Sequence, residues 1–382
     1  MSKLAHPDGR RRPSLMKKKS WFKIHRRLVM ILAIALAVIV VMVVAVFAVL
    51  NFFNNRNVEN DQLAKPIKKV EPVRYYSPLT GRETTEKKTA ATVLAVMIEN
   101  SPEARPQSGL IEAGVVFEAV AEGGITRFLV IYQESEPALI GPVRSIRPYY
   151  VEWAAAFDSA VAHVGGSDEA ISMMRNGNYG VDLDQFYNDS TYWRVKDRYA
   201  PHNVYTDYTH LSQLAESKGK MTSNFIGFTR ETIKSDSDST KTADTPAIDI
   251  KFDISGSQYV VSYHYDEATK TYQRSVGGKS HLSRSLDKIT TQITPDVVIA
   301  IRVKQTLAAD GFHNQITTTG SGEAFVFQNG QVIKGTWSKT SVTSQIYFYD
   351  ETDNEIELKR GQTWITAIPA SRAITWETSS AP

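Results

Sequence analysis

The longest uninterrupted run of apolar residues covers residues 28–50 and contains no charged side chain. In a helix that rises about 1.5 Å per residue, this run is long enough to cross the roughly 30 Å hydrocarbon core of a bilayer. Basic residues precede it directly, so the positive-inside rule predicts a cytoplasmic tail at residues 1–27 and an extracytoplasmic remainder. A cleaved signal peptide is the alternative, but its apolar core spans only about 7–15 residues. We therefore expect an uncleaved, single-pass helix in the cytoplasmic membrane.

Two polar segments divide the rest of the chain. Residues 51–75 are rich in Asn and Lys, contain two prolines and predict a tether. Residues 231–246 hold few apolar side chains and predict an exposed linker. The linker separates a first globular region, residues 76–230, from a second one, residues 247–375.

The first region has the pattern of an α/β domain. Residues 160–175 combine an apolar run, a Gly-Gly turn and a helical pattern, which predicts a crossover unit with a ligand-facing turn. Short runs rich in β-branched residues predict further strands. The expected strands are residues 93–98, 115–120, 128–132 and 160–164, and the expected helices are residues 148–157 and 168–175.

The second region alternates between polar and apolar residues over short runs, which predicts a mostly β domain. Asn329-Gly330 between two such runs predicts a type I′ hairpin, and Asp353-Asn354 predicts a second hairpin. The expected strands are residues 259–265, 297–303, 325–327, 332–337, 346–349, 356–358 and 363–368.

Composition and charge exclude several classes of protein. The chain has no cysteine, which excludes disulfides, thiolate metal sites and a lipid-modified cysteine. Its net charge of +3 combines +9 in residues 1–27 with −6 in the remainder. A mildly acidic body argues against a nucleic-acid partner. No redox-cofactor or nucleotide motif is evident, so we expect no cofactor from the residues alone.

Arginines are the most suggestive polar residues of the first region, because they lie in loops just beyond the expected strands. Guanidinium groups bind phosphate or carboxylate through two parallel hydrogen bonds. Convergent arginines would therefore suit an anionic ligand, whereas pairing with nearby Glu and Asp side chains would make them structural. Both interpretations stay open for Arg105, Arg127, Arg144, Arg147, Arg194 and Arg198.

Other polar residues of these loops are candidates for chemistry. Glu118 and Glu122 could hold Mg²⁺ beside a phosphate, although they need not share a face of the strand. His163 and His202 could act as general bases, but His163 lies in an apolar strand, which favours a hydrogen-bonded structural role. Ser167 follows a Gly-Gly turn of the kind that cradles phosphate.

Nine stretches of this chain resemble the YerB-like bacterial family. In the first region they are residues 76–81 (YSPLTG), 104–110 (ARPQSGL), 122–128 (EGGITRF), 141–150 (GPVRSIRPYY), 163–167 (HVGGS) and 198–206 (RYAPHNVYT). In the second region they are residues 274–281 (RSVGGKSH), 320–337 (GSGEAFVFQNGQVIKGTW) and 361–365 (GQTWI). The resemblance implies a cell-envelope protein with two domains of no established activity. Family members are often lipoproteins, so here the expected location agrees while the anchor differs.

A more distant similarity is to the LytR-CpsA-Psr family of single-span envelope enzymes. Residues 126–132, 141–148 and 160–174 follow that family's layout. Those enzymes transfer a glycopolymer from a polyprenyl diphosphate carrier to the cell wall, with arginines on the diphosphate and acidic residues on Mg²⁺. This similarity implies diphosphate contacts for Arg144 and Arg147, and Mg²⁺ as a cofactor. The two residues between these arginines are Ser-Ile, where that family typically has Arg-Asp.

We therefore expect a membrane-anchored extracytoplasmic protein that binds an anionic envelope ligand, containing phosphate or glycan, through its Arg-rich loops. The alternatives are the polyprenyl-diphosphate transferase and a structural protein partner in a wall-remodelling complex. Catalytic residues and metal ligands stay unassigned. The expected ligand-binding residues are Arg105, Glu118, Glu122, Arg127, Arg144, Arg147, His163, Ser167, Arg194, Arg198, His202 and Asn203.

Overall fold

The computed structural model of the protein describes residues 16–62, 73–232 and 248–378. The chain divides into two compact units, Met1–Pro72 and Val73–Pro382, and each is described here by itself. Parts of three expected segments lie outside the described residues. They are residues 1–15 of the cytoplasmic tail, residues 63–72 of the tether and residues 233–246 of the linker.

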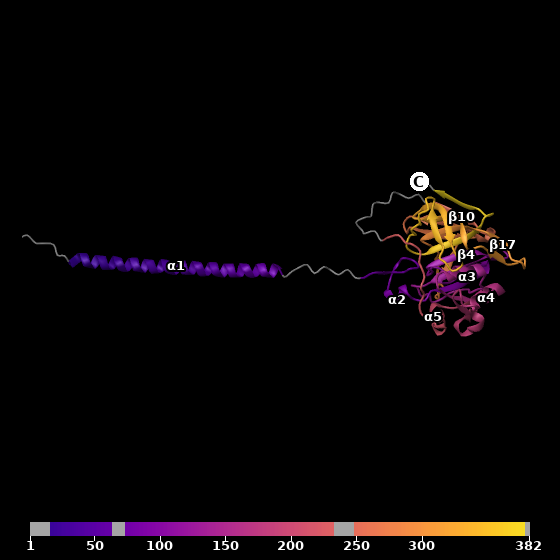
Figure 1. Ribbon diagram of the computed structural model, residues 1–382, viewed down its shortest axis with the longest axis horizontal. Coiled ribbons are helices and arrows are strands. Elements are labelled where there is room, and N and C mark those ends of the chain that lie inside the picture. Colours follow the sequence, from indigo (N-terminus) through magenta and orange to yellow (C-terminus); the bar gives the residue numbers. More distant parts are fainter. Residues whose placement is uncertain (1–15, 63–72, 233–247, 379–382) are drawn as a thin grey trace, which may run out of the picture. The chain divides into compact units, whose positions relative to one another are not determined.

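The first unit contains one long helix, α1 (Met16–Gln62), which Figure 1 shows as a continuous coil. Its segment His25–Asn55 is long and apolar enough to cross a membrane, by length and composition. The apolar side chains of this segment are exposed; Val41, for example, is 67% accessible. The helix also includes residues 51–62, which we expected to be tether, because this stretch contains no proline or glycine to end it.

The second unit is built on one ten-stranded sheet with the order β21-β20-β19-β16-β22-β4-β5-β3-β6-β7. Strand β22 of the second sequence region pairs in parallel with β4 of the first, with Ile365 opposite Phe117. The two regions therefore share a single sheet. Its strands are β3 (Leu94–Glu99), β4 (Val115–Glu122), β5 (Ile125–Tyr132), β6 (Ala160–His163), β7 (Val181–Asp184), β16 (Val297–Val303), β19 (Gly320–Gln328), β20 (Gln331–Lys339), β21 (Tyr347–Asp350) and β22 (Thr363–Pro369).

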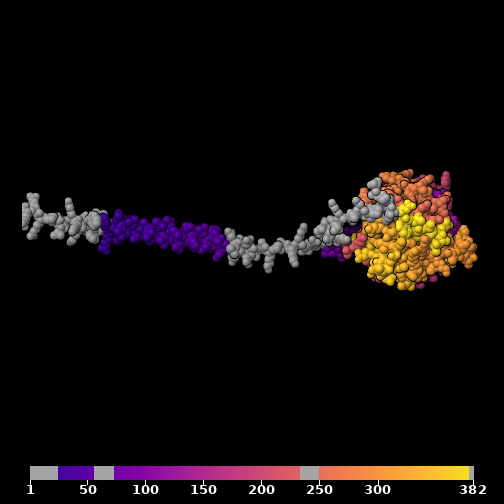
Figure 2. All heavy atoms as spheres, turned by 90° about the horizontal axis from the view of Figure 1, so that it is seen from above, coloured from indigo at the N-terminus to yellow at the C-terminus, as the bar shows by residue number. Residues whose placement is uncertain are grey.

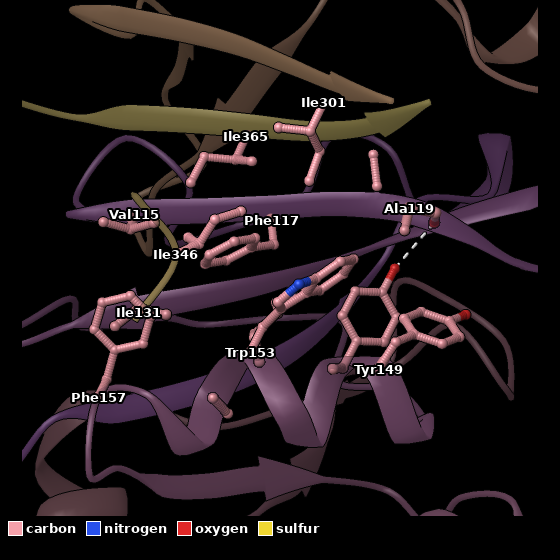
Figure 3. Packing of buried hydrophobic residues seen from close by; sticks show 14 of the residues in the cluster. Val115, Phe117, Ala119, Ile131, Tyr149, Trp153, Phe157, Ile301, Ile346 and Ile365 are labelled. Atoms are coloured by element: carbon pink, nitrogen blue, oxygen red, sulfur yellow. Dashed lines mark hydrogen bonds between the residues drawn. The ribbon is translucent and has the colours of Figure 1, made fainter. Parts of the chain in front are cut away.

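Helices α3 (Pro148–Ala155) and α4 (Asp168–Arg175) confirm the two expected helices and cover one face of this sheet. Proline at the first position of α3 suits a helix start, because its missing N–H would be unpaired there. Figure 3 shows Trp153 of α3 against Phe117 of β4, and their rings stack with centroids 5.1 Å apart. Helix α5 (Tyr208–Ser217) packs on the opposite face.

The α/β expectation for the first region holds only in part. Strands β3, β6 and β7 are parallel, and α4 connects β6 to β7 as a crossover unit requires. Strand β5 is instead antiparallel to both of its neighbours, β4 and β3, and the short Gly123-Gly124 turn joins β4 directly to β5. The first region is thus a mixed sheet with helices on both faces.

The second region adds a five-stranded sheet with the order β13-β12-β11-β10-β23. It packs on the large sheet through a shared apolar core that includes Phe252, Tyr263 and Phe327. In Figure 1, β10 and α3 lie on opposite sides of β4. The strands of this sheet are β10 (Ile248–Asp253), β11 (Val260–Asp266), β12 (Thr271–Val276), β13 (Lys279–Ser280) and β23 (Ile374–Thr378). The second region is mostly β, as expected.

One of the two expected hairpins is confirmed in full. Asn329 and Gly330 have φ of 52° and 69°, the left-handed conformation of a type I′ turn, between β19 and β20. The other hairpin is confirmed in part. The chain reverses at Asp353-Asn354 and returns to β21, with an antiparallel bridge between Tyr349 and Glu355 and a hydrogen bond from the Ile356 N–H to the Phe348 carbonyl (2.8 Å). Residues 356–358 form no strand, and Leu358 bridges Arg230.

The remaining elements are short and lie around the two sheets. They are α2 (Glu86–Thr89), β1 (Tyr75–Tyr76), β2 (Glu83–Thr84), β8 (Trp193–Arg194), β9 (Val204–Tyr205), β14 (Leu282–Arg284), β15 (Thr290–Gln292), β17 (Gln305–Leu307) and β18 (Asn314–Ile316). In the space-filling view of Figure 2, the C-terminal part of the chain, in orange and yellow, forms most of the visible face of the second unit.

Candidate functional site

Residues 100–107 form the loop that follows β3, and several candidate side chains meet around it and around Glu99, the last residue of the strand. The buried Glu99 carboxylate accepts hydrogen bonds from Ser101 Oγ (3.0 Å) and His202 Nδ1 (3.0 Å). Arg144 Nε lies 3.4 Å from the same carboxylate. The fold therefore brings Arg144 and His202 together at the end of β3, with Glu99 as their common partner.

Arg105 is held in place by residues from both sequence regions. Its Nε donates to Asn100 Oδ1 (3.0 Å), and its Nη2 donates to the carbonyls of Asn100 (2.9 Å) and Gln258 (3.1 Å). The guanidinium also stacks on the Tyr259 ring, 5.3 Å from its centroid. Burial lowers the pKa of Arg105. Its Nη1 takes part in no hydrogen bond among the described residues, so this one amino group is available to donate to a ligand.

A cavity of about 390 Å³ lies beside Arg105, and we refer to it as the Arg105 cavity. Its charged lining side chains are Arg105 and Lys279, both cations, and no carboxylate lines it. The charge of this cavity therefore favours an anion. The lining residues are Pro102, Arg105, Pro106, Gln258, Val276, Gly277, Lys279, Ser280, His281 and Leu282.

Asn100 connects the loop to a fully buried ion pair. Its Nδ2 donates to Glu118 Oε1 (3.2 Å), which also accepts from Thr126 Oγ1 (3.0 Å). Glu118 Oε2 accepts from Arg274 Nη2 (2.6 Å) and Trp364 Nε1 (3.2 Å). Four donors thus satisfy both oxygens of the Glu118 carboxylate, as a buried charge requires. Glu118 therefore has a structural role, because its carboxylate joins the first sequence region to Arg274 and Trp364 of the second.

Glu122, Arg127 and Arg147 form a second group at the turn end of β4 and β5. Glu122 Oε2 accepts from Arg147 Nη2 (2.7 Å) and Nε (3.1 Å), and Glu122 Oε1 pairs with Arg127. Arg127 also donates to the Ser145 carbonyl (3.0 Å). Burial and the neighbouring Arg127 charge lower the pKa of Arg147. The two arginines are therefore engaged as ion pairs, one of the two interpretations that the sequence left open.

A β-bulge explains why Glu118 and Glu122 have different partners. Residues four apart in a regular strand share one face. The register of β4 against β5 shifts between Val120 and Glu122, so the side chain of Glu122 turns toward Arg127 and Arg147. Among the described residues, no three His, Asp or Glu side chains are grouped as metal ligands.

Arg147 and Ser167 line a larger cavity of about 660 Å³. It lies between the first residues of α3 and α4 and the β17–β18 hairpin. Ser167 Oγ accepts a hydrogen bond from the Ala170 N–H (3.4 Å) and so caps α4. The other charged lining residues are Lys304, His313, Glu152, Asp168, Glu169 and Asp310. Its carboxylates outnumber its cations, so this cavity suits an anion less well than the Arg105 cavity.

Both ring nitrogens of the buried His163 have partners. Nε2 lies 3.0 Å from Asp182 Oδ1, and Nδ1 lies 2.9 Å from the Gly165 carbonyl. This arrangement matches the hydrogen-bonded structural role that its apolar strand favours. Burial raises the pKa of Asp182, but hydrogen bonds, above all the one from His163, lower it overall.

The last three candidate residues stabilise the loop that carries His202. Arg194 Nη1 donates to Asn203 Oδ1 (2.7 Å), and Asn203 Nδ2 donates to the Arg198 carbonyl (3.3 Å). Arg198 Nη2 donates to the Pro106 carbonyl (2.6 Å), which connects this loop to the loop of residues 100–107. Burial lowers the pKa of Arg198.

Comparison with known proteins places the chain in a family. Residues 79–221 match the model of the family "Protein of unknown function (DUF3048) N-terminal domain", and residues 248–365 match that of its C-terminal domain. The chain is 33% identical over 298 residues to the protein named "Putative lipoprotein YerB" of Bacillus subtilis (strain 168), covering 77% of this chain and 86% of the relative. The chain belongs to the YerB-like family.

A solved structure agrees with this assignment. The crystal structure of YerB from Bacillus subtilis superimposes with a TM-score of 0.68 at 29% sequence identity. The match covers 79% of this chain and 99% of the crystallised chain. The YerB-like fold therefore accounts for the second unit of this protein.

In this YerB-like protein, the 12 candidate residues fall into separate places. Arg105 lines a cation-lined cavity, Arg144 and His202 share Glu99, and Arg127 and Arg147 share Glu122. The residues that the sequence did not single out are Arg274, Lys279 and His281, although the resemblance included residues 274–281. The sequence did contain a signal for Arg274. It lies on the same face of the alternating strand β12 as Tyr272 and Val276, which are both buried, so a charged residue stands at a core position.

Proposed function

We propose that this protein is anchored in the cytoplasmic membrane by α1, with its second unit outside, and that it binds a small anionic envelope ligand in the Arg105 cavity. The apolar segment His25–Asn55 and the basic residues before it support the anchor and its orientation. The printed name of the Bacillus subtilis relative describes a lipoprotein, which supports a membrane location. This chain has no cysteine, so here the helix takes the place of a lipid.

The ligand proposal rests on one observation, which is the positive charge of the residues that line the Arg105 cavity. Its two charged lining side chains, Arg105 and Lys279, are cations from different sequence regions. Arg105 is oriented by Asn100 and Tyr259, so little conformational entropy is lost when its Nη1 group binds an anion. Phosphate and carboxylate oxygens both accept hydrogen bonds from such a cationic amino group.

The binding test uses the whole chain in detergent micelles, titrated with inorganic diphosphate and with methyl phosphate in a thermal-shift assay. A ligand at about 100 times its Kd stabilises the fold by about 2.7 kcal/mol, which raises the melting temperature measurably. We expect this shift to be lost in Arg105→Ala and reduced in Lys279→Ala. Arg194→Ala is the matched control, because Arg194 lines neither of the two cavities described above. A folded wild-type protein that shows no shift with either anion would refute the proposal.

The orientation can be tested with single cysteines, since the chain has none of its own. Tyr199 is 91% exposed, and Tyr199→Cys is expected to react with a membrane-impermeant maleimide on intact cells. Lys17→Cys, before the apolar segment, is expected to react only after the membrane is permeabilised. The opposite labelling pattern would show that the predicted orientation is wrong.

The transferase alternative needs an apolar groove beside the arginines that would hold the diphosphate. Arg147 lines a cavity with many charged and polar side chains, and its guanidinium is engaged by Glu122. The partner alternative would need an extended apolar surface on the second sequence region.

We favour ligand binding over both alternatives, because the two cations that line the Arg105 cavity supply the charge that an anion requires.

A further inference from the structure

Apolar residues form a large part of the wall of the Arg105 cavity. Pro102 and Pro106 belong to the loop of residues 100–107, and Leu282 belongs to β14 of the second sequence region. Pro102 is exposed, and Pro106 and Leu282 are partly exposed, so each of the three lines the cavity and keeps accessible surface. Gly277, which also lines the cavity, adds no side chain that would fill it. The cavity therefore offers a ligand accessible hydrocarbon surface.

The fold holds this apolar wall in position. Arg198 Nη2 donates to the Pro106 carbonyl (2.6 Å), and the Arg284 N–H donates to the Gln107 carbonyl (2.6 Å). The second hydrogen bond holds β14 beside the loop that carries both prolines. A proline ring also fixes the φ of its own residue. Apolar contacts with a ligand therefore cost little conformational entropy on the side of the protein.

The cations of the same cavity are accessible as well. Arg105 Nη1 makes no hydrogen bond among the described residues, and it is not one of their buried unpaired atoms. Lys279 is exposed. A molecule in the cavity thus meets positive charge and hydrocarbon within about 390 Å³. An anion without a hydrocarbon part would use only the charge, because it removes no apolar surface of its own from water.

We propose that the ligand of the Arg105 cavity is an amphiphilic anion, a phosphate or carboxylate group that carries a compact hydrocarbon group. The anionic group binds Arg105 and Lys279, and the hydrocarbon group packs on Pro102, Pro106 and Leu282. This inference rests on the proposed function, because it concerns the same cavity and the same two cations. A volume of about 390 Å³ accommodates a small hydrocarbon group beside the anion. The cavity thereby favours a small organic anion over inorganic phosphate or diphosphate.

The experiment compares two matched pairs of anions on the whole chain in detergent micelles, by calorimetry and thermal shift. Butyl phosphate is compared with methyl phosphate, and pentanoate with acetate, so that the members of each pair differ only in the length of the alkyl chain. Each fully buried CH₂ group tightens binding about fourfold, so we expect the longer member to bind at least about tenfold more tightly. The pair that binds more tightly as a whole identifies phosphate or carboxylate as the charged group.

Two variants separate the apolar contact from the charge. Leu282→Asn keeps the approximate size of the side chain but makes it polar, and we expect the preference for the longer chain to fall to about threefold or less while methyl phosphate binds as before. Lys279→Gln is the matched control, because it removes the charge but keeps most of the aliphatic stem. It should weaken all four anions while the preference for the longer chain remains.

The outcomes distinguish this inference from the proposed function. If the anions bind the wild type but neither pair differs, this inference is wrong and the proposed function stands. If none binds, both fall. A folded Leu282→Asn protein that keeps the full preference also overturns the inference, because the alkyl chain then binds elsewhere. If this variant does not fold, the wild-type pairs decide.

Discussion

At the scale of single residues, the Glu118–Arg274 pair is the ion pair of the described residues in which both side chains are completely buried. Both side chains are fully inaccessible to solvent, and they belong to different sequence regions. A buried charge is costly unless it is paired and hydrogen-bonded, and Glu118 has four donors around it. The same pairing means that neither partner can be removed alone without leaving an uncompensated charge.

Arg274→Met should therefore destabilise the protein by about 3–5 kcal/mol, because it leaves the Glu118 carboxylate buried and unpaired. The double variant Arg274→Met with Glu118→Gln leaves no charge and should recover a large part of this loss. Urea unfolding of the whole chain in detergent, followed by tryptophan fluorescence, measures both values. Equal stabilities of the single and double variants would contradict the assignment of the cost to the unpaired carboxylate.

The burial of His281 predicts that the stability of the protein depends on pH. Its pKa in the folded protein lies below the value of about 6.5 expected for the unfolded chain, mainly because of burial. Below that pH the unfolded state binds more protons than the folded state, so the free energy of unfolding falls as the pH falls. His281 contributes no such slope above that pH. Comparing wild type with His281→Phe at pH 5 and pH 7.5 should show a smaller pH-dependent loss in the variant, and identical losses would contradict the prediction.

At the scale of secondary-structure elements, close backbone contacts decide which residues are tolerated. An added Cβ at Gly335 in β20 would lie 1.8 Å from the Tyr349 carbonyl oxygen of the neighbouring strand β21. The main chain of β21 cannot keep its position against a side chain there. At Gly256, which has an extended backbone, no atom lies within 4 Å of an added Cβ.

Gly335→Ala should accordingly destabilise the protein by about 1–3 kcal/mol, the usual cost of overpacking a buried contact. Gly256→Ala is the matched control and should change stability by less than about 0.5 kcal/mol. Urea midpoints of the two variants provide the measurement. A Gly335→Ala protein as stable as its control would show that β21 can move away from β20 at little cost.

At the scale of the whole molecule, the two sequence regions depend on each other through the ten-stranded sheet. Strand β22, near the C-terminus, lies between β16 and β4 and is parallel to both. Without the second region, β4 would expose an unpaired apolar edge, which favours aggregation. The family domains at residues 79–221 and 248–365 are therefore parts of one folded unit in this protein.

A chain limited to residues 73–232 should fail to form a protease-resistant monomer, because β4 loses β22 and Glu118 loses Arg274. Residues 73–382 form the control, since they include the whole second unit. Limited proteolysis and size-exclusion chromatography compare the two. A soluble, resistant monomer of residues 73–232 would contradict the view that the shared sheet is needed for folding.

The local pattern of apolar and polar residues predicted most of the individual strands and helices. It did not predict that strands of the two sequence regions pair in one sheet. Residues 297–303 and 363–368 were predictable as strands because their apolar, β-branched runs differ from the polar segments around them. Their parallel pairing with each other and with β4 depends on contacts between residues far apart in sequence. For the same reason the sequence could not choose between a ligand site and ion pairs for Arg127 and Arg147.

The sequence by itself determined the properties that depend on local composition. These are the apolar helix, the turn at Asn329-Gly330, the family membership and the presence of many arginines in the loops of the first region. Only the tertiary structure decided which arginines have spare hydrogen-bonding capacity. Arg147 is engaged by Glu122, whereas Arg105, which lines the same cavity as Lys279, keeps its Nη1 group free of hydrogen bonds among the described residues. The physical reason is that a guanidinium's partners are set by the three-dimensional positions of carboxylates and carbonyls, and residues such as Gln258 reach Arg105 only when the two regions fold together.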